Sequence, residues 1–380
     1  MSIYYFDNSA TTKVKKEVID EMIPYFSEEY GNPSSIYSLG RNSKKAIEKA
    51  RKQLADLIGC KKNEIYFVGS GTEADNMAIK GIAYKNQHKG NHIITSKIEH
   101  LAVLESCKFL EKQGFEITYL NVDKNGFIDL NELRNTIRED TILISIMFAN
   151  NEIGTIEPIE DIAEIAKSKN IIFHTDAVQA VGNVKIDVKK MNIDMLSISS
   201  HKIYGPKGVG ALYISENIEI EKFLNGGHQE KNIRASTENV PGIVGFGKAA
   251  EMVNSDLDNH IRKLKELKNY YVENIITTIP DTKINGAVNA RLPGNSNISF
   301  KNINSSDLLL ELDNSGICAS GGSACNSKEP TPSHVLNAIG VESEWINGAI
   351  RVTFGDFNTK EEVDYLIKNI AESVKKLRNQ

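Results

Sequence analysis

Hydrophobic residues in the first part of the chain recur at helical spacing and then gather in short runs. Between residues 41 and 59 six apolar side chains share one helical face, and Gly59 follows where a helix C-cap favours glycine: Ala46, Ile47, Ala50, Leu54, Leu57 and Ile58. A β-rich run at 64–68, a glycine turn at 69–73 and a second helical pattern through Met77, Ile79 and Ile82 come next. The pattern predicts helix, strand, turn and helix in that order.

The alternation of strands and helices continues for some 150 residues. The pattern predicts helices near 102–113 and 159–168, and strands at 92–95, 116–120, 141–147, 171–175, 195–199 and 208–214. Strands separated by helices pair in parallel and are covered on both faces. We therefore expect an α/β fold with a mostly parallel sheet and helices on both faces.

The pattern changes near residue 250. A long charged helix is predicted at 257–275, a short strand at 297–300 and an amphipathic helix at 360–377. We expect a large α/β domain at 15–250, and a smaller α+β domain made of 1–14 and 251–380.

Composition narrows the classes of partner. The net charge is −5, from 45 basic and 50 acidic residues spread without a long single-sign block, so the sequence predicts no nucleic-acid surface. No apolar run approaches the roughly 18–20 residues that span a bilayer, and the first residues lack the charged and apolar regions of a signal peptide. We expect a cytoplasmic protein that does not bind a membrane.

Polar residues follow the predicted strands, at the sheet edge where ligands of α/β proteins bind. They comprise a glycine turn opening a helix, a histidine, an asparagine, an aspartate with a glutamine, and a lysine before a glycine-proline turn: Gly69 to Thr72, His100, Asn151, Asp176, Gln179 and Lys202. Each also has a purely structural reading, as a helix cap, a turn or a surface lysine.

Together these residues match the needs of one cofactor. Pyridoxal phosphate requires a lysine for its aldehyde, a carboxylate for its ring nitrogen, a flat partner for its ring and an anion site for its phosphate. The set therefore predicts a pyridoxal-phosphate site with Lys202 as the anchor.

A cysteine distinguishes between the reactions that this cofactor supports. Cys325 lies in Ser320-Gly321-Gly322-Ser323-Ala324-Cys325-Asn326-Ser327, a loop of small residues in which a thiol can approach a substrate. Cys60 and Cys107 instead follow or lie within amphipathic helices, and Cys318 follows Ile317 in a strand-like setting. The four cysteines form no Cys-x-x-Cys pair and are too few for a disulfide framework.

These motifs resemble the cysteine desulfurases that supply sulfur for iron–sulfur clusters and thiolated tRNA, within the class V aminotransferase family of fold-type I pyridoxal-phosphate enzymes. The resemblance runs from Tyr5-Phe6-Asp7-Asn8-Ser9-Ala10-Thr11-Thr12 to Gly348-Ala349-Ile350-Arg351. One departure is Gly355-Asp356-Phe357, where Gly-Arg-Phe is more typical, which removes a positive charge expected near Arg351.

The resemblance implies a role for each matching residue. Lys202 matches the cofactor's lysine, Asp176 the partner of the ring nitrogen, His100 the catalytic residue stacked on the ring, and Cys325 the cysteine that becomes a persulfide. Arg351 matches the ligand of the substrate carboxylate, and Asn151 is expected beside both cofactor and substrate. Further cofactor ligands are implied for the ring hydroxyl at Gln179, for the phosphate at Gly71, Thr72, Ser199 and His201, and for the phosphate of the other subunit at Thr237.

The implied enzyme is a homodimer that converts L-cysteine to L-alanine and passes the sulfur from Cys325 to an acceptor protein, either an iron–sulfur scaffold or a tRNA-thiolation enzyme. The resemblance implies no resident metal, although Cys325 is a possible transient ligand of an iron–sulfur cluster. The alternatives are a selenocysteine lyase or another class V aminotransferase, both of which would use the same lysine and aspartate, and a non-enzymatic scaffold.

Overall fold

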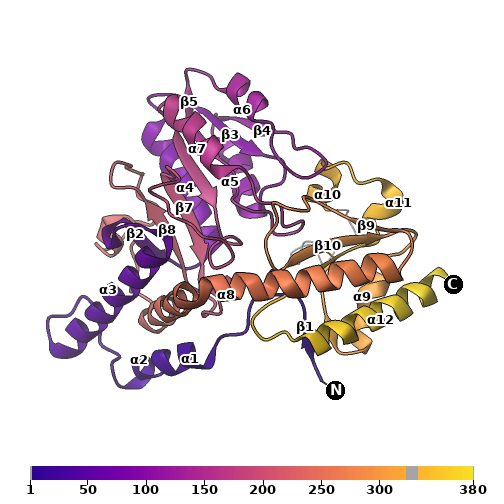
Figure 1. Ribbon diagram of the computed structural model, residues 1–380. Helices are drawn as coiled ribbons and strands as arrows, with labels where there is room; N and C mark the ends of the chain where they lie inside the picture. Colours follow the sequence, from indigo (N-terminus) through magenta and orange to yellow (C-terminus); the bar gives the residue numbers. More distant parts are fainter. Residues whose placement is uncertain (1, 322–332, 380) are drawn as a thin grey trace.

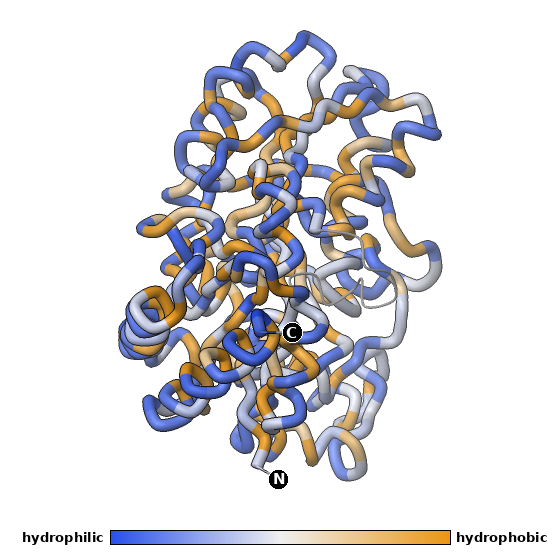
Figure 2. The backbone as a smooth tube through the Cα atoms, turned by 90° about the vertical axis from the view of Figure 1, so that its right-hand side faces the viewer, coloured by the Kyte–Doolittle hydropathy of each residue, from blue (hydrophilic) through white to orange (hydrophobic). Residues whose placement is uncertain are grey.

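A computed structural model describes residues 2–321 and 333–379 (Figure 1). The elements form two groups, and one long helix, α8 (Val240–Thr278), runs from the first group to the second. Hydrophobic and hydrophilic stretches alternate along the backbone, and many turns at the periphery are hydrophilic (Figure 2). Among the described residues, no helix is long and apolar enough to cross a membrane.

The first group is built on a seven-stranded sheet in the order β2-β8-β7-β6-β5-β3-β4. β8 runs antiparallel to both of its neighbours, and the strands from β7 to β4 pair in parallel. The mostly parallel sheet predicted from the sequence is therefore confirmed. Its strands are β2 (Ile65–Val68), β3 (His92–Ser96), β4 (Glu116–Leu120), β5 (Thr141–Ser145), β6 (Ile172–Asp176), β7 (Met195–Ser199) and β8 (Gly210–Ile214).

Helices cover both faces of this sheet, because successive strand residues point to opposite sides. On β3, Ile93 packs in the cluster that holds helices α4 and α5, whereas Ile94 packs in the cluster on the opposite face, with α3 and α7. The helices of this group are α1 (Lys16–Met22), α2 (Pro24–Ser27), α3 (Ser38–Ile58), α4 (Gly71–Asn86), α5 (Leu101–Glu111), α6 (Leu130–Thr136) and α7 (Ile159–Ser168). Gly59 ends α3 with a φ of 71°, as predicted.

The second group surrounds an antiparallel sheet in the order β12-β10-β9. Its core joins Phe6 to apolar residues between Leu264 and Val374, and β1 (Tyr4–Tyr5) pairs with β11 (Ile317–Cys318). The remaining elements are β9 (Thr282–Ile284), β10 (Asn295–Phe300), β12 (Ala349–Thr353), α9 (Ser305–Asn314), α10 (His334–Ala338), α11 (Ser343–Ile346) and α12 (Lys360–Arg378).

The predicted boundary at residue 250 falls inside α8, so the division into 1–14 with 251–380 and 15–250 stays a prediction. The two groups also share a small apolar cluster, in which Val335 and Leu336 of α10 pack against Ile98 and Met147, from the segments that follow β3 and β5. This packing places α10 beside the carboxyl ends of the parallel strands.

Candidate functional site

A cavity of about 260 Å³ opens at the carboxyl ends of β6 and β7. Asp176 is the last residue of β6, Ser199 the last of β7, and Gly71 the first of α4. The structure brings together ten of the predicted site residues in its lining: Gly71, Thr72, His100, Asn151, Asp176, Gln179, Ser199, His201, Lys202 and Arg351.

The N-terminus of α4 forms one wall of the cavity. Ser70 caps this helix by accepting a hydrogen bond from the backbone N–H of Glu73 at 3.1 Å, and the next residues, Gly71 and Thr72, face the cavity. A Cβ on Gly71 would lie 2.7 Å from Val178 Cγ2, so a larger residue at position 71 would collide with the Val178 side chain. Free N–H groups and the helix dipole make this end of α4 attractive to an anion.

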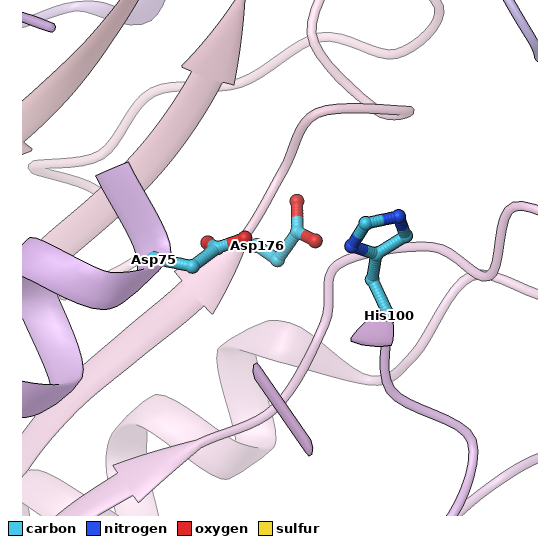
Figure 3. A group of neighbouring side chains, drawn as sticks. All are labelled: Asp75, His100 and Asp176. Atoms are coloured by element: carbon cyan, nitrogen blue, oxygen red, sulfur yellow. The ribbon is translucent and has the colours of Figure 1, made fainter. Parts of the chain in front are cut away.

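Buried carboxyl groups lie at the base of the cavity. Asp176 and Asp75 are 6% and 1% exposed, and Figure 3 shows the Asp176 side chain between those of Asp75 and His100. Burial raises the pKa of Asp176, and burial together with the nearby Asp176 raises the pKa of Asp75 well above its ordinary value. His174 Nε2 lies 3.7 Å from Asp75, but burial lowers the pKa of His174 to about 3, so it is neutral there.

His100 is held beside Asp176 by the start of α5. Its Nδ1 accepts a hydrogen bond from the backbone N–H of Ala102 at 3.1 Å, so the neutral ring carries its proton on Nε2. Burial lowers the pKa of His100, and the positive charges of Lys202 and His334 lower it further against the opposing effect of Asp176. A neutral, partly buried imidazole is suited to stack on a flat ligand or to exchange a proton.

Asp75, His100 and Asp176 lie close enough to one another to hold one metal ion. Ligand atoms of Asp75, His100 and Asp176 all lie within 4.8 Å of one another. Lys202 lines the same cavity, and its charge acts on His100. The positive charge of Lys202 would repel a metal cation held by Asp75, His100 and Asp176.

Lys202 closes the cavity from the end of β7. Its Nζ donates hydrogen bonds to the carbonyl oxygens of Ser9 and, at 2.9 Å, of Ala10. The short 3₁₀ turn Ser200–Lys202 directs this side chain away from the strand, and Tyr204 follows with a φ of 65°. His201, in the same turn, accepts from or donates to Thr11 Oγ1 at 3.1 Å, and burial with the charge of Lys202 lowers its pKa to about 4.

Arg351 lies across the cavity on β12 and is 2% exposed. Its Nη1 donates to the carbonyl oxygen of Asn151 at 3.0 Å, and its Nη2 pairs with Asp7 at 2.8 Å. The buried Nε has no hydrogen-bond partner among the described residues. A guanidinium with an unused donor in a cavity wall is a ready ligand for a carboxylate.

Cys325 lies outside the described residues, but the chain on either side of its loop is at the cavity. Ser320 forms a backbone bridge with Arg351, with Arg351 donating its N–H to Ser320 O at 2.6 Å. On the other side, Ser333 donates to Glu152 at 2.5 Å, and His334 lines the cavity and contacts the carbonyl oxygen of Glu99 at 3.0 Å. Both flanks of residues 322–332 therefore reach the walls of the site.

Thr237 is not part of this cavity. It lines a separate pocket of about 120 Å³, together with Gly69, Arg234 and Asn239. Asp356, the departure noted above, pairs with Lys15 and with His260 Nδ1 at 2.5 Å. It has no ion pair with Arg351 within the described part of the chain, so its contacts are those of a structural group.

Several lining residues were missed by the reasoning from sequence. Asp75 and Glu152 are buried and face the cavity, as do Ser9, Ala10 and His334. Asp75 is four residues after Gly71, hence on the same face of α4, and this spacing was a usable signal. Glu152 directly follows the predicted Asn151 in the loop after β5, so its position was also a usable signal. Ser9, Ala10 and His334 come from segments whose approach to the strand ends depends on the packing of the second group.

Comparisons with known proteins agree with this geometry. The chain matches the class V aminotransferase family over residues 4–366. Cysteine desulfurase IscS of Methanosarcina thermophila is 57% identical over 375 residues, which cover 99% of this chain and 93% of that protein. A NifS-like protein of known structure has a TM-score of 0.93 at 39% identity, covering 99% of this chain and 100% of that one.

A third similarity concerns a structure with a bound ligand. The structure described as SspA in complex with cysteine has a TM-score of 0.82 at 37% identity, covering 94% of this chain and 100% of that one. The chain therefore belongs to the class V aminotransferase family and, within it, to the cysteine desulfurases.

Proposed function

We propose that pyridoxal phosphate occupies the cavity and that this enzyme uses it to remove the sulfur atom of L-cysteine, releasing L-alanine. One observation carries the proposal: a lysine, a buried carboxyl group and a helix N-terminus face each other across a single cavity. The names of the relatives favour this reaction over those of a selenocysteine lyase or another class V aminotransferase.

The residues that line the cavity fit both the ring and the phosphate group of the cofactor. Asp176 is buried and has no ion-pair partner in the described part of the chain, and a protonated ring nitrogen would supply that partner and favour the carboxylate. Gly71, Thr72, Ser199 and His201 would hold the phosphate group, and Gln179, whose Nε2 donates to Ser9 O at 2.9 Å, would bind the ring hydroxyl. When bound, pyridoxal phosphate supplies an aldehyde for the substrate's amino group and a ring that accepts the electron pair left by the α-proton.

Arg351 and Asn151 would orient the substrate. Arg351 is fixed by Asp7 and by the carbonyl of Asn151, which leaves its Nε for the carboxylate of L-cysteine. Lys202, which holds the cofactor in the resting enzyme, would then remove the α-proton at its Nζ. The neutral ring of His100 would stack on the cofactor and exchange protons with the substrate.

Cys325 would take the sulfur. Its thiolate attacks the sulfur of the substrate, an S–S bond forms as the Cβ–S bond breaks, and the electron pair of the broken bond passes to the substrate Cβ. Protonation of Cβ gives the methyl group of alanine, and Cys325 keeps the sulfur as a persulfide. The positions of Ser320 and Ser333 support this role, because both flanks of the loop reach the site.

Two partners belong to the proposal. The enzyme would act as a homodimer in which Thr237 completes the phosphate site of the second copy, which accounts for its place outside the cavity of its own chain. The persulfide would pass to an acceptor protein of iron–sulfur assembly or tRNA thiolation.

The exchange Cys325→Ala tests the role of the cysteine. The variant should keep the visible absorption of the cofactor and its change on adding L-cysteine, but lose sulfide release, by at least about 100-fold, because the nucleophile is absent. Cys318→Ala is the matched control, since Cys318 lies on β11 and outside the cavity lining. Normal desulfuration by Cys325→Ala would show that another group takes the sulfur.

A further inference from the structure

A second cavity, of about 660 Å³, shares no lining residue with the active-site cavity in the described part of the chain. One wall is the C-terminal half of α8, the long helix labelled in Figure 1, and the others are the segment from Val288 to Asn295 and residues 183–185. It is larger than the 260 Å³ active-site cavity, and of the predicted catalytic and cofactor-binding residues that the structure describes, none lines it. No part of the proposed reaction uses it.

Two buried cations line this cavity. Lys268 on α8 and Arg291 are each 8% exposed. Arg291 donates from Nε to the carbonyl oxygen of Ala287 at 2.6 Å and from Nη2 to that of Asn285, but its buried Nη1 has no hydrogen-bond partner among the residues that the structure describes. Neither Lys268 nor Arg291 forms an ion pair with a carboxylate within residues 2–321 and 333–379. Lysine and arginine are seldom buried unless they are paired.

The other described residues that line the cavity add little negative charge to balance Lys268 and Arg291. Lys265 and Lys185 also line the cavity, and Lys185 is paired with Asp258 at 2.8 Å. Glu273 is the acidic residue of the lining, and it lies exposed on α8. Burial, with the charges of Arg291 and Lys265, lowers the pKa of Lys268 to about 8, and burial lowers that of Arg291 to about 10. The amides of Asn183, Asn269 and Asn289 add uncharged donors.

We propose that this cavity is a binding site for the oxyanion group of a small metabolite, a phosphate or a carboxylate, held by Lys268 and by the unused Nη1 of Arg291. An anion there would supply the partner that both cations lack, and charge-assisted hydrogen bonds of this kind are strong in a desolvated site. The volume leaves room for an organic group beyond the oxyanion. The site is independent of the pyridoxal-phosphate proposal.

Calorimetric titration of the cofactor-loaded enzyme tests the site, because loading first fills the phosphate position at Gly71. Inorganic phosphate and succinate serve as separate probes, in a buffer without other oxyanions. We expect at least one of them to bind the wild type with a dissociation constant below about 10 mM, and Lys268→Met to weaken that binding at least about 10-fold. Which probe binds identifies the oxyanion as phosphate or carboxylate.

Matched variants separate this site from general charge effects. Lys368→Met removes the same charge from an exposed position of α12 and should leave binding unchanged, while Lys268→Arg should retain most of it. Without an added anion, Lys268→Met should unfold at the same or a higher temperature, because it removes an unpaired buried charge. If it does not fold, Lys268→Gln takes its place. Failure of both probes to bind the wild type, or equal binding by the Lys268 variant, would overturn the proposal.

Discussion

At the scale of single residues, the position of Arg351 sets what the site can recognise. Two of its three nitrogens are committed to Asp7 and Asn151, which fixes the plane of the guanidinium. Arg351→Lys would keep the charge but lose this planar geometry, so we expect kcat/KM for L-cysteine to fall about 100-fold, mainly through KM. Steady-state sulfide release measures kcat and KM for the variant, and the absorption of the bound cofactor checks that the site is intact. An unchanged KM would mean that Arg351 does not bind the substrate carboxylate.

Some site residues were predictable from sequence for a physical reason. Asp176, Ser199 and Lys202 end or directly follow buried parallel strands, and such ends converge on one sheet edge in any doubly covered sheet. Asp75 was not singled out, although its spacing from Gly71 on α4 was a usable signal. His334 could not be found from the pattern, because it reaches the cavity through the packing of α10, which depends on contacts between segments far apart in the chain.

At the scale of elements, an ion-pair cluster joins three segments near the site. Asp356, after β12, pairs with Lys15 ahead of α1 and with His260 on α8. Burial alone would raise the pKa of Asp356, but the hydrogen bonds and charges of His260 and Lys15 lower it to about 2. The carboxylate form is therefore favoured in the folded state.

The exchange Asp356→Asn should reveal this coupling as a pH-dependent loss of stability. Because the folded pKa is depressed, the stabilisation is fully present above the unfolded pKa of about 4 and disappears as the pH falls through about 2. We expect the variant to lose on the order of 1–2 kcal/mol of unfolding free energy at pH 7, and less at pH 3. Denaturant unfolding at the two pH values measures it, and an equal loss at both would contradict the ion-pair account.

The elements themselves were predicted unevenly. The helix at 41–59 and the strands of the large sheet matched well, because their hydrophobic patterns are regular. The helix predicted at 257–275 is instead part of α8, which begins at Val240. Its first turns are rich in glycine, and a Cβ on Gly247 would lie 2.5 Å from Ala50 Cα, so close packing against α3 replaces the usual helical signal.

At the scale of the whole molecule, the proposed dimer makes a prediction about mixed subunits. Lys202→Ala should abolish desulfuration, and Thr237→Val should weaken cofactor binding. If Thr237 serves the second copy, a hybrid of these two variants contains one site with both defects and one with neither. Unfolding and refolding the mixture should therefore restore activity that neither homodimer has at limiting cofactor. Hybrids no more active than the Thr237 variant alone would show that Thr237 acts within its own chain.

The central claim is that Lys202, in the turn that follows β7, is the lysine that binds pyridoxal phosphate, and trapping the cofactor tests it most directly. The purified enzyme, reduced with borohydride and digested, should yield a single peptide carrying the pyridoxyl group, with the label on Lys202. Prior addition of L-cysteine should lower the yield of this peptide, because the substrate takes the place of the lysine. A label on Lys207, Lys13 or any other lysine, or no label at all, would contradict the account.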